Sequence, residues 1–158
     1  MSFNSIIGAA LQELGQQIVT QMKANLVKNR SNASGYLSNS IQSEPKQGDK
    51  GPYIDISMAD YGGAVDEGRS RSTKGGPKQT WAKKIVNWIR LKGITPRQGV
   101  TPKQLAFLIT RKINRKGYQA KPFIQPAINE VIKSNLSITM NKAVTQALNE
   151  TLDNIKLK

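Results

Sequence analysis

The chain has 158 residues, with 24 Lys and Arg against 10 Asp and Glu, and it contains no cysteine and no histidine. This length predicts one domain spanning residues 1–158, and the missing residue types exclude disulfides, thiolate chemistry and the usual general base near neutral pH. The net charge of +14 predicts attraction to polyanions or to acidic protein surfaces.

No apolar run approaches the roughly 20 residues that span a bilayer, and the first ten residues lack the basic leader of a secretory signal. We therefore expect an intracellular protein that does not contact a membrane.

Residues 4–28 are predicted to form the first helix, because apolar residues recur there at spacings of three and four. The predicted core-facing stripe consists of Ile7, Leu11, Leu14, Ile18, Met22 and Leu26. A polar stretch over residues 29–35 breaks this pattern, so we expect the helix to end there.

A small antiparallel sheet is predicted next. Residues 34–41 indicate a turn leading into a strand, and residues 45–52, rich in Pro, Gly, Asp and Lys, indicate a hairpin loop. Beyond the loop, apolar residues alternate with polar ones over 53–58, which is the period-two pattern of a half-buried strand. Two strands alone are marginally stable, so we expect a helix on one face of them or strands from a neighbouring subunit.

Residues 59–68 predict a short helix or turn that ends at Gly68. From about 69 to 79 the chain consists of Ser, Lys, Arg, Gly, Pro, Thr and Gln, with no apolar residue to anchor it. We expect a mobile basic loop there.

Two short amphipathic helices are predicted at 80–92 and 101–116. Each starts at a threonine N-cap and is followed by a glycine that ends it. These four residues are Thr80 and Gly93 for the first helix and Thr101 and Gly117 for the second. The predicted core faces consist of Trp81, Ile85, Trp88 and Ile89 in the first helix and Leu105, Leu108, Ile109 and Ile113 in the second.

An extended stretch at 118–122 leads into the last predicted helix, which runs from about 124 to 155. Such a helix would reach about 45 Å, which is longer than a compact domain of this size requires. We expect its tail to pack on the first helix or on a neighbouring subunit, and the pattern leaves both arrangements open.

The whole positive charge is concentrated in residues 69–129, which hold fifteen Lys and Arg and no Asp or Glu. In the rest of the chain, nine basic and ten acidic residues nearly cancel. A basic surface of this kind attracts phosphate or an acidic protein. The candidate contacts to DNA or to an acidic surface are Lys83, Lys84, Lys103, Arg111, Lys112, Arg115 and Lys116.

The two central helices also suggest an alternative function, a small basic DNA-binding protein with a helix-turn-helix-like segment at 80–116. Two features argue against it. The connection over residues 93–100 is longer than the usual turn of about three or four residues, and Gln104 is the only polar base-reading side chain near the start of the second helix.

A weaker alternative is a hydrolase that uses the acidic residues Asp60, Asp66 and Glu67. Such an enzyme needs two carboxylates that converge on a cleft, and the sequence offers no phosphate loop and no metal-ligand spacing beside them. We expect these acids to cap helices or to pair with lysines, and we predict no catalytic, metal-binding or cofactor-binding residue.

Several short motifs follow one another in a specific order. They are Gly35-Tyr36-Leu37-Ser38-Asn39-Ser40-Ile41, Val65-Asp66-Glu67-Gly68-Arg69, Trp88-Ile89-Arg90-Leu91-Lys92-Gly93-Ile94, Leu105-Ala106-Phe107-Leu108-Ile109-Thr110-Arg111-Lys112-Ile113 and Lys121-Pro122-Phe123-Ile124-Gln125-Pro126-Ala127. Together with the Gly-Pro-containing basic loop, this order resembles the tail-completion or head–tail connector (neck) proteins of tailed bacteriophages, over about residues 34–130. The predicted C-terminal helix departs from that family because it continues well past Pro126, which leaves the layer of the neck open.

The resemblance implies an α+β fold with a long N-terminal helix, a small antiparallel β-hairpin, two short central helices and a long C-terminal helix. It also implies a virion structural protein, assembled in the host bacterial cytoplasm, that forms a homo-oligomeric ring between portal and tail. The implied partners are portal, adaptor or tail proteins of the same virion, with possible contact to packaged DNA, and the implied protein is not an enzyme. A ring requires a closed heterologous interface between copies.

The interface expected from this resemblance lies within residues 69–129, which we call the basic segment. The basic loop would order against an acidic neighbouring surface or face DNA, while Pro122 and Phe123 would supply a rigid turn and an apolar anchor. The candidate subunit or partner interface comprises Arg69, Arg71, Lys74, Lys78, Trp88, Lys121, Pro122 and Phe123.

Overall fold

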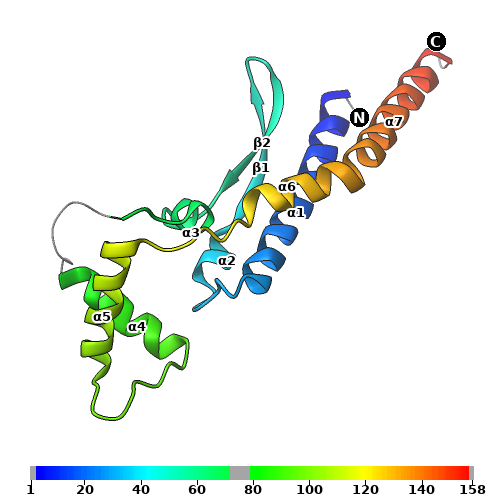
Figure 1. The fold of residues 1–158 in the computed structure, drawn as a ribbon. Coiled ribbons are helices and arrows are strands. Elements are labelled where there is room, and N and C mark those ends of the chain that lie inside the picture. Colours follow the sequence, from blue (N-terminus) through cyan, green and yellow to red (C-terminus); the bar gives the residue numbers. More distant parts are fainter. Residues whose placement is uncertain (1–2, 72–78, 157–158) are drawn as a thin grey trace.

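The computed structural model describes residues 3–71 and 79–156 of the chain. It contains a body and an outlying helical hairpin (Figure 1). The helical hairpin consists of α4 (Gln79–Leu91) and α5 (Pro102–Lys116), which make their main contacts with each other. The body holds the other helices and an antiparallel two-stranded sheet, so the fold is α+β, as predicted.

The central element of the body is α1 (Phe3–Lys28), because the β-hairpin and the C-terminal helices all pack against it. The β-hairpin consists of β1 (Gln42–Gly48) and β2 (Gly51–Ser57). It approaches α1 closely at Gly15, where an added Cβ would lie 2.9 Å from the Ser43 Oγ. The main core cluster consists of Leu14, Ile18, Met22, Leu26, Leu37, Ile41, Phe123, Ala127 and Val131. The two strands are therefore supported by a helix of the same chain.

The region before the sheet differs from the prediction. Residues Tyr36–Ser40 form a short helix, α2, and the first strand starts only after it. The strands also extend into the predicted loop, with Pro45 opposite Ile54 and Pro52 opposite Gln47. Proline is tolerated at these positions because each strand of a two-stranded sheet has an open edge.

The helix ends near the basic segment follow the glycines. α3 (Gly62–Glu67) ends at Gly68, and α5 ends at Gly117, as predicted. α4 begins at Gln79, so Thr80 lies inside its first turn and is not the N-cap. Most of the predicted basic loop falls on residues 72–78, which lie outside the described residues.

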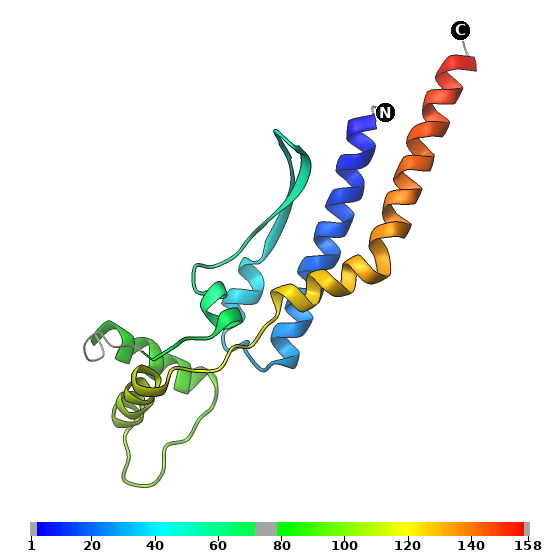
Figure 2. The same cartoon turned by 45° about the horizontal axis from the view of Figure 1, so that its top comes forward.

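The C-terminal region bends, although one continuous helix was expected. It consists of α6 (Ile124–Val131), a π-helical turn η1 (Ile132–Leu136) and α7 (Ser137–Lys156), and the chain changes direction between α6 and α7 (Figure 2). Buried residues on these helices recur at multiples of four: Ala127, Val131, Thr139, Ala143 and Ala147. In an α-helix, each residue of such a row is rotated by about 40° around the helix axis from the one four positions before it. The π turn has more residues per turn, so it offsets part of this rotation.

α7 lies beside α1 and runs in the opposite direction, so the start of α1 and the end of α7 lie at the same end of the molecule (Figure 1). Ala143 and Ala147 of α7 form one buried cluster with Ile6 and Ala10 of α1. The expected contact between the C-terminal tail and the first helix is therefore made within one chain. We refer to α7 and the part of α1 that it contacts as the terminal arm. None of the described helices is both long and apolar enough to cross a membrane.

Candidate protein-binding surface on the helical hairpin

The helical hairpin is joined to the body by two antiparallel linkers. Arg69 and Tyr118 exchange two backbone hydrogen bonds of 3.0 Å, and the Tyr118 hydroxyl donates to the Ala64 carbonyl at 3.0 Å. Gly117 has a φ of 72°, and a Cβ placed on it would lie 1.9 Å from the Arg69 carbonyl oxygen. Because only glycine fits here, the joint brings two backbones together more closely than any other residue would allow.

A second attachment uses two lysines of the basic segment. Lys92 Nζ donates to the carbonyl oxygens of Arg30 at 3.0 Å and Asn32 at 2.9 Å, and Lys121 Nζ donates to that of Asn29 at 2.9 Å. These carbonyls follow the C-terminal end of α1, where a positive charge is favourable. Arg30 itself holds a left-handed φ of 52°. The ammonium of Lys121, which was predicted at a partner interface, thus makes an intramolecular contact in this structure.

The start of α6 is held by an acidic residue of the Val65-Asp66-Glu67-Gly68-Arg69 motif. Asp66 Oδ1 accepts hydrogen bonds from the backbone N–H groups of Phe123 at 2.7 Å and Ile124 at 2.9 Å. The expectation that Asp66 caps a helix is confirmed. Asp60 and Glu67 are exposed, and within the described part of the chain no three acidic residues gather into a metal-binding group.

The prediction that Phe123 faces a partner is wrong for its side chain. Phe123 is 0 % exposed and belongs to the main core of the body. Its burial follows from the capped turn at Asp66, which directs the chain into α6 across α1. Pro122 is exposed, and its carbonyl accepts a hydrogen bond from the Asn29 Nδ2 at 2.9 Å.

The start of α5 is fixed by a reciprocal cap. The Thr101 Oγ1 accepts from the Gln104 backbone N–H at 3.3 Å, and the Gln104 Oε1 accepts from the Thr101 backbone N–H at 2.8 Å. This is the capping-box arrangement. Gln104, the one side chain suited to base reading in the DNA-binding hypothesis, is therefore occupied by the cap.

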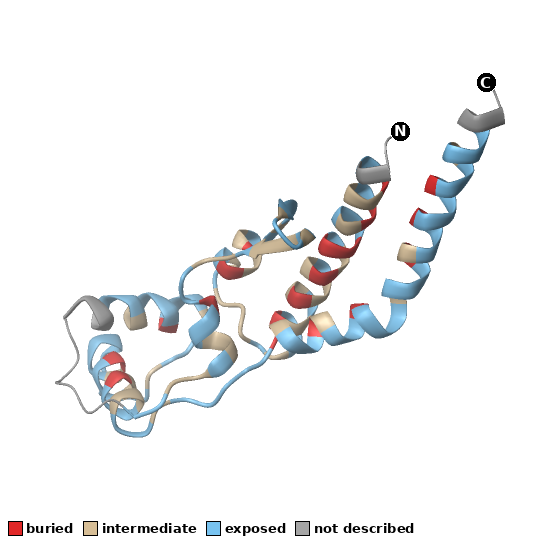
Figure 3. Ribbon diagram, turned by 90° about the horizontal axis from the view of Figure 1, so that it is seen from above, coloured by how far each residue is buried: buried red, intermediate tan, exposed pale blue. Residues whose placement is uncertain are grey.

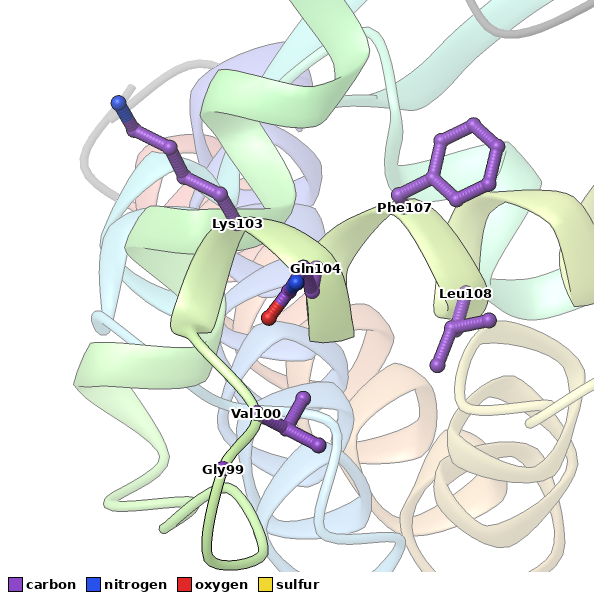
Figure 4. Close-up of a pocket in the computed structure, with 6 residues that line it drawn as sticks. All are labelled: Gly99, Val100, Lys103, Gln104, Phe107 and Leu108. Carbon is purple, nitrogen blue, oxygen red and sulfur yellow. The ribbon is translucent and has the colours of Figure 1, made fainter.

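The outer face of α5 exposes large apolar side chains. Phe107 is 54 % exposed and Leu108 is 52 % exposed. Together with Val100 and the Lys103 stem they line an open pocket at the start of the helix (Figure 4). The predicted core face of α5 is therefore wrong at Leu108. The buried positions are instead Ala106 and Thr110. Residues two positions apart on a helix are separated by about 200°, so Leu108, midway between them, lies on the opposite side of α5.

Cations surround this apolar pair. The seven candidate contacts predicted for DNA or an acidic surface, Lys83, Lys84, Lys103, Arg111, Lys112, Arg115 and Lys116, are all exposed. Within the described residues none of the seven forms an ion pair. We define the α5 face as Phe107 and Leu108 with the neighbouring Lys103, Arg111 and Arg115. The helical hairpin also presents Trp88, which is 38 % exposed.

Of the remaining predicted interface residues, the structure describes two, Arg69 and Arg71. Arg71 is exposed and Arg69 lies in the joint described above, whereas Lys74 and Lys78 lie outside the described residues. Comparison of the chain with protein-family models, with curated proteins and with solved structures finds no match. The function is therefore inferred from the chain's own fold and surfaces.

Proposed function

We propose that this chain is a structural subunit of a tailed-phage virion, a head–tail connector or tail-completion protein that assembles as a ring and contacts portal, adaptor or tail proteins. The order of long helix, β-hairpin, central helices and C-terminal helices agrees with what the motif resemblance implies. The proposal requires docking surfaces and no catalytic group. In keeping with this, Asp66 serves to hold α6.

The observation that carries the proposal is the α5 face. Two half-exposed large apolar side chains stand among unpaired cations on a hairpin with no acidic residue. Covering Phe107 and Leu108 with a partner would contribute roughly 2 kcal/mol together, since full burial of such a side chain is worth about 1.5–3 kcal/mol. The surrounding cations would select an acidic protein surface and accelerate its approach. Such a face suits a subunit that joins one protein to another.

A small DNA-binding protein is the second candidate, favoured by the unpaired cations on α4 and α5. Exposed apolar side chains are a poor match to the phosphate contacts that dominate DNA affinity. The Gln104 Oε1 accepts within the cap and is therefore not available for a bidentate contact to a base. We therefore rank this function below the connector.

The test combines solution mass with a genetic experiment. The purified chain is measured at low and high salt, with and without duplex DNA, and its gene is deleted from the phage or prophage that carries it. A connector predicts ring-sized species or partner binding that persists at physiological salt, and a deletion that leaves filled heads and tails unjoined. Joined, infectious particles after deletion would refute the connector. A small species that binds duplex, with affinity falling steeply as salt rises, would establish the second candidate.

A further inference from the structure

An apolar ridge runs along the C-terminal helices and is exposed on both sides of Met140, which is partly buried against the core. It has a large apolar residue at every fourth position: Ile132, Leu136, Met140, Val144, Leu148 and Leu152. All of these except Met140 are exposed, with Leu148 at 57 % and Leu152 at 52 %. The ridge extends over about 30 Å of helix. We refer to these six residues as the α7 ridge.

The α7 ridge lies next to the row that packs on α1. Ala143 and Ala147 face α1, and the residues that follow them, Val144 and Leu148, are left uncovered. Figure 3 shows the same division, with buried positions on the side of α7 that faces α1 and exposed positions along the rest of the helix. The apolar face of α7 therefore consists of two neighbouring rows, and α1 covers only one of them.

The middle part of the α7 ridge has almost no charge around it. Residues 134–149 contain a single charged side chain, that of Lys142. The row that flanks the ridge on its outer side consists of Ser137, Asn141, Thr145 and Asn149, all exposed. Depletion of charge around exposed large apolar residues is the composition of a protein interface core. A helix that binds a membrane surface is rich in Lys and Arg on its polar face, whereas residues 134–149 contain one lysine.

We propose that the α7 ridge is the contact between neighbouring copies of this chain, and that the terminal arm of a second copy covers it. Two copies that each carry +14 repel when their helical hairpins meet. The terminal arm is where they approach without bringing like charges together. A ridge of residues spaced by four is also the feature that packs into a groove of another helix. The inference rests on the proposed function in one respect, that a ring needs such a contact.

The experiment is sedimentation velocity of the full chain over a wide concentration range, at low and high salt. The test variant is Leu148→Gln with Leu152→Gln, both at exposed positions. The matched controls are Phe107→Gln with Leu108→Gln on the α5 face and Val27→Gln, which replaces an exposed apolar residue of α1 away from the ridge. We expect the wild-type chain and both controls to associate, more strongly at high salt because the repulsion between copies is screened. We expect the ridge variant to associate at least about tenfold more weakly.

A second variant separates loss of the contact from misfolding of the chain. Thr145→Glu leaves the α7 ridge intact and places a carboxylate on its exposed flank, so it too should weaken association. Circular dichroism verifies that each variant keeps the wild-type helix content. A wild-type chain that stays monomeric throughout, ridge variants that associate like the wild type, or association that weakens as salt rises would each overturn the inference. None of these measurements uses a virion, so failure of the ridge is distinguishable from failure of the connector proposal, which the deletion experiment reports.

Discussion

The carboxylate of Asp66 accepts a hydrogen bond of 2.7 Å from the backbone N–H of Phe123, 57 residues further along the chain. A second bond, from the Ile124 N–H at 2.9 Å, uses the same oxygen. Between these two positions lies the helical hairpin with the α5 face. The short contact therefore fixes where the chain leaves the body and where it returns, and it places Phe123 in the core.

Asp66→Ala should destabilise the body by about 0.5–2 kcal/mol, the range for loss of a helix cap. The two backbone N–H groups would lose their acceptor near a buried side chain. Asp66→Asn keeps one oxygen acceptor and should lose less. Urea unfolding monitored by circular dichroism measures both. The exposed Asp60→Ala is the control and should stay within about 0.5 kcal/mol of the wild type; equal effects at the two positions would contradict the capping role.

Gly117→Ala should destabilise the chain by at least about 3 kcal/mol, because the new Cβ would meet the Arg69 carbonyl oxygen at 1.9 Å. Gly99→Ala is the matched control, since Gly99 also has a positive φ, of 80°, but has open space around its Cβ position. It should lose only the conformational cost of about 1–2 kcal/mol. The difference between the two unfolding free energies isolates the close approach of the linkers. If both variants lose the same amount, the joint is looser than described.

Lys92→Met should loosen the attachment of α4 to the turn after α1. The substitution keeps the apolar stem and removes the ammonium that donates to the Arg30 and Asn32 carbonyls. We expect a loss of about 1 kcal/mol and faster amide hydrogen exchange in the turn that follows α1. Lys103→Met, at an exposed position whose ammonium makes no hydrogen bond or ion pair with the described residues, should change neither quantity. Unchanged exchange in the Lys92 variant would show that the linkers alone hold the hairpin.

Two double variants on α5 should separate the two candidate functions. Phe107→Ser with Leu108→Ser should weaken binding of a protein partner by about 2 kcal/mol. It should lower the free energy of unfolding by no more than about the same amount, because about half of each side chain is buried within the chain. Arg111→Ala with Arg115→Ala should instead reduce any binding to duplex DNA and lower its salt dependence. Calorimetric titration with a partner and gel shift with duplex measure the two effects. A chain that binds duplex but no protein partner, and that loses this binding in the arginine variant only, would be a nucleic-acid protein.

Local signals in the sequence predicted the helix ends near the basic segment. Thr101 and Gln104 form a cap through their own side chains, and Gly68 and Gly117 supply the positive φ that ends α3 and α5. Such features depend on residues a few positions apart, so the sequence alone determines them. The α+β class followed from the same local patterns, together with the family resemblance.

Tertiary packing decided which apolar faces are covered. The spacing of Ala143, Val144, Ala147 and Leu148 indicates a helix with a wide apolar face, but only the position of α1 determines that the two alanines are buried and the other two are exposed. The same holds for Phe123, which the resemblance placed at a partner interface and which lies in the core, with its backbone N–H donating to Asp66. Periodicity reports the width of an apolar face, whereas burial depends on residues far away in the chain that come to lie against it.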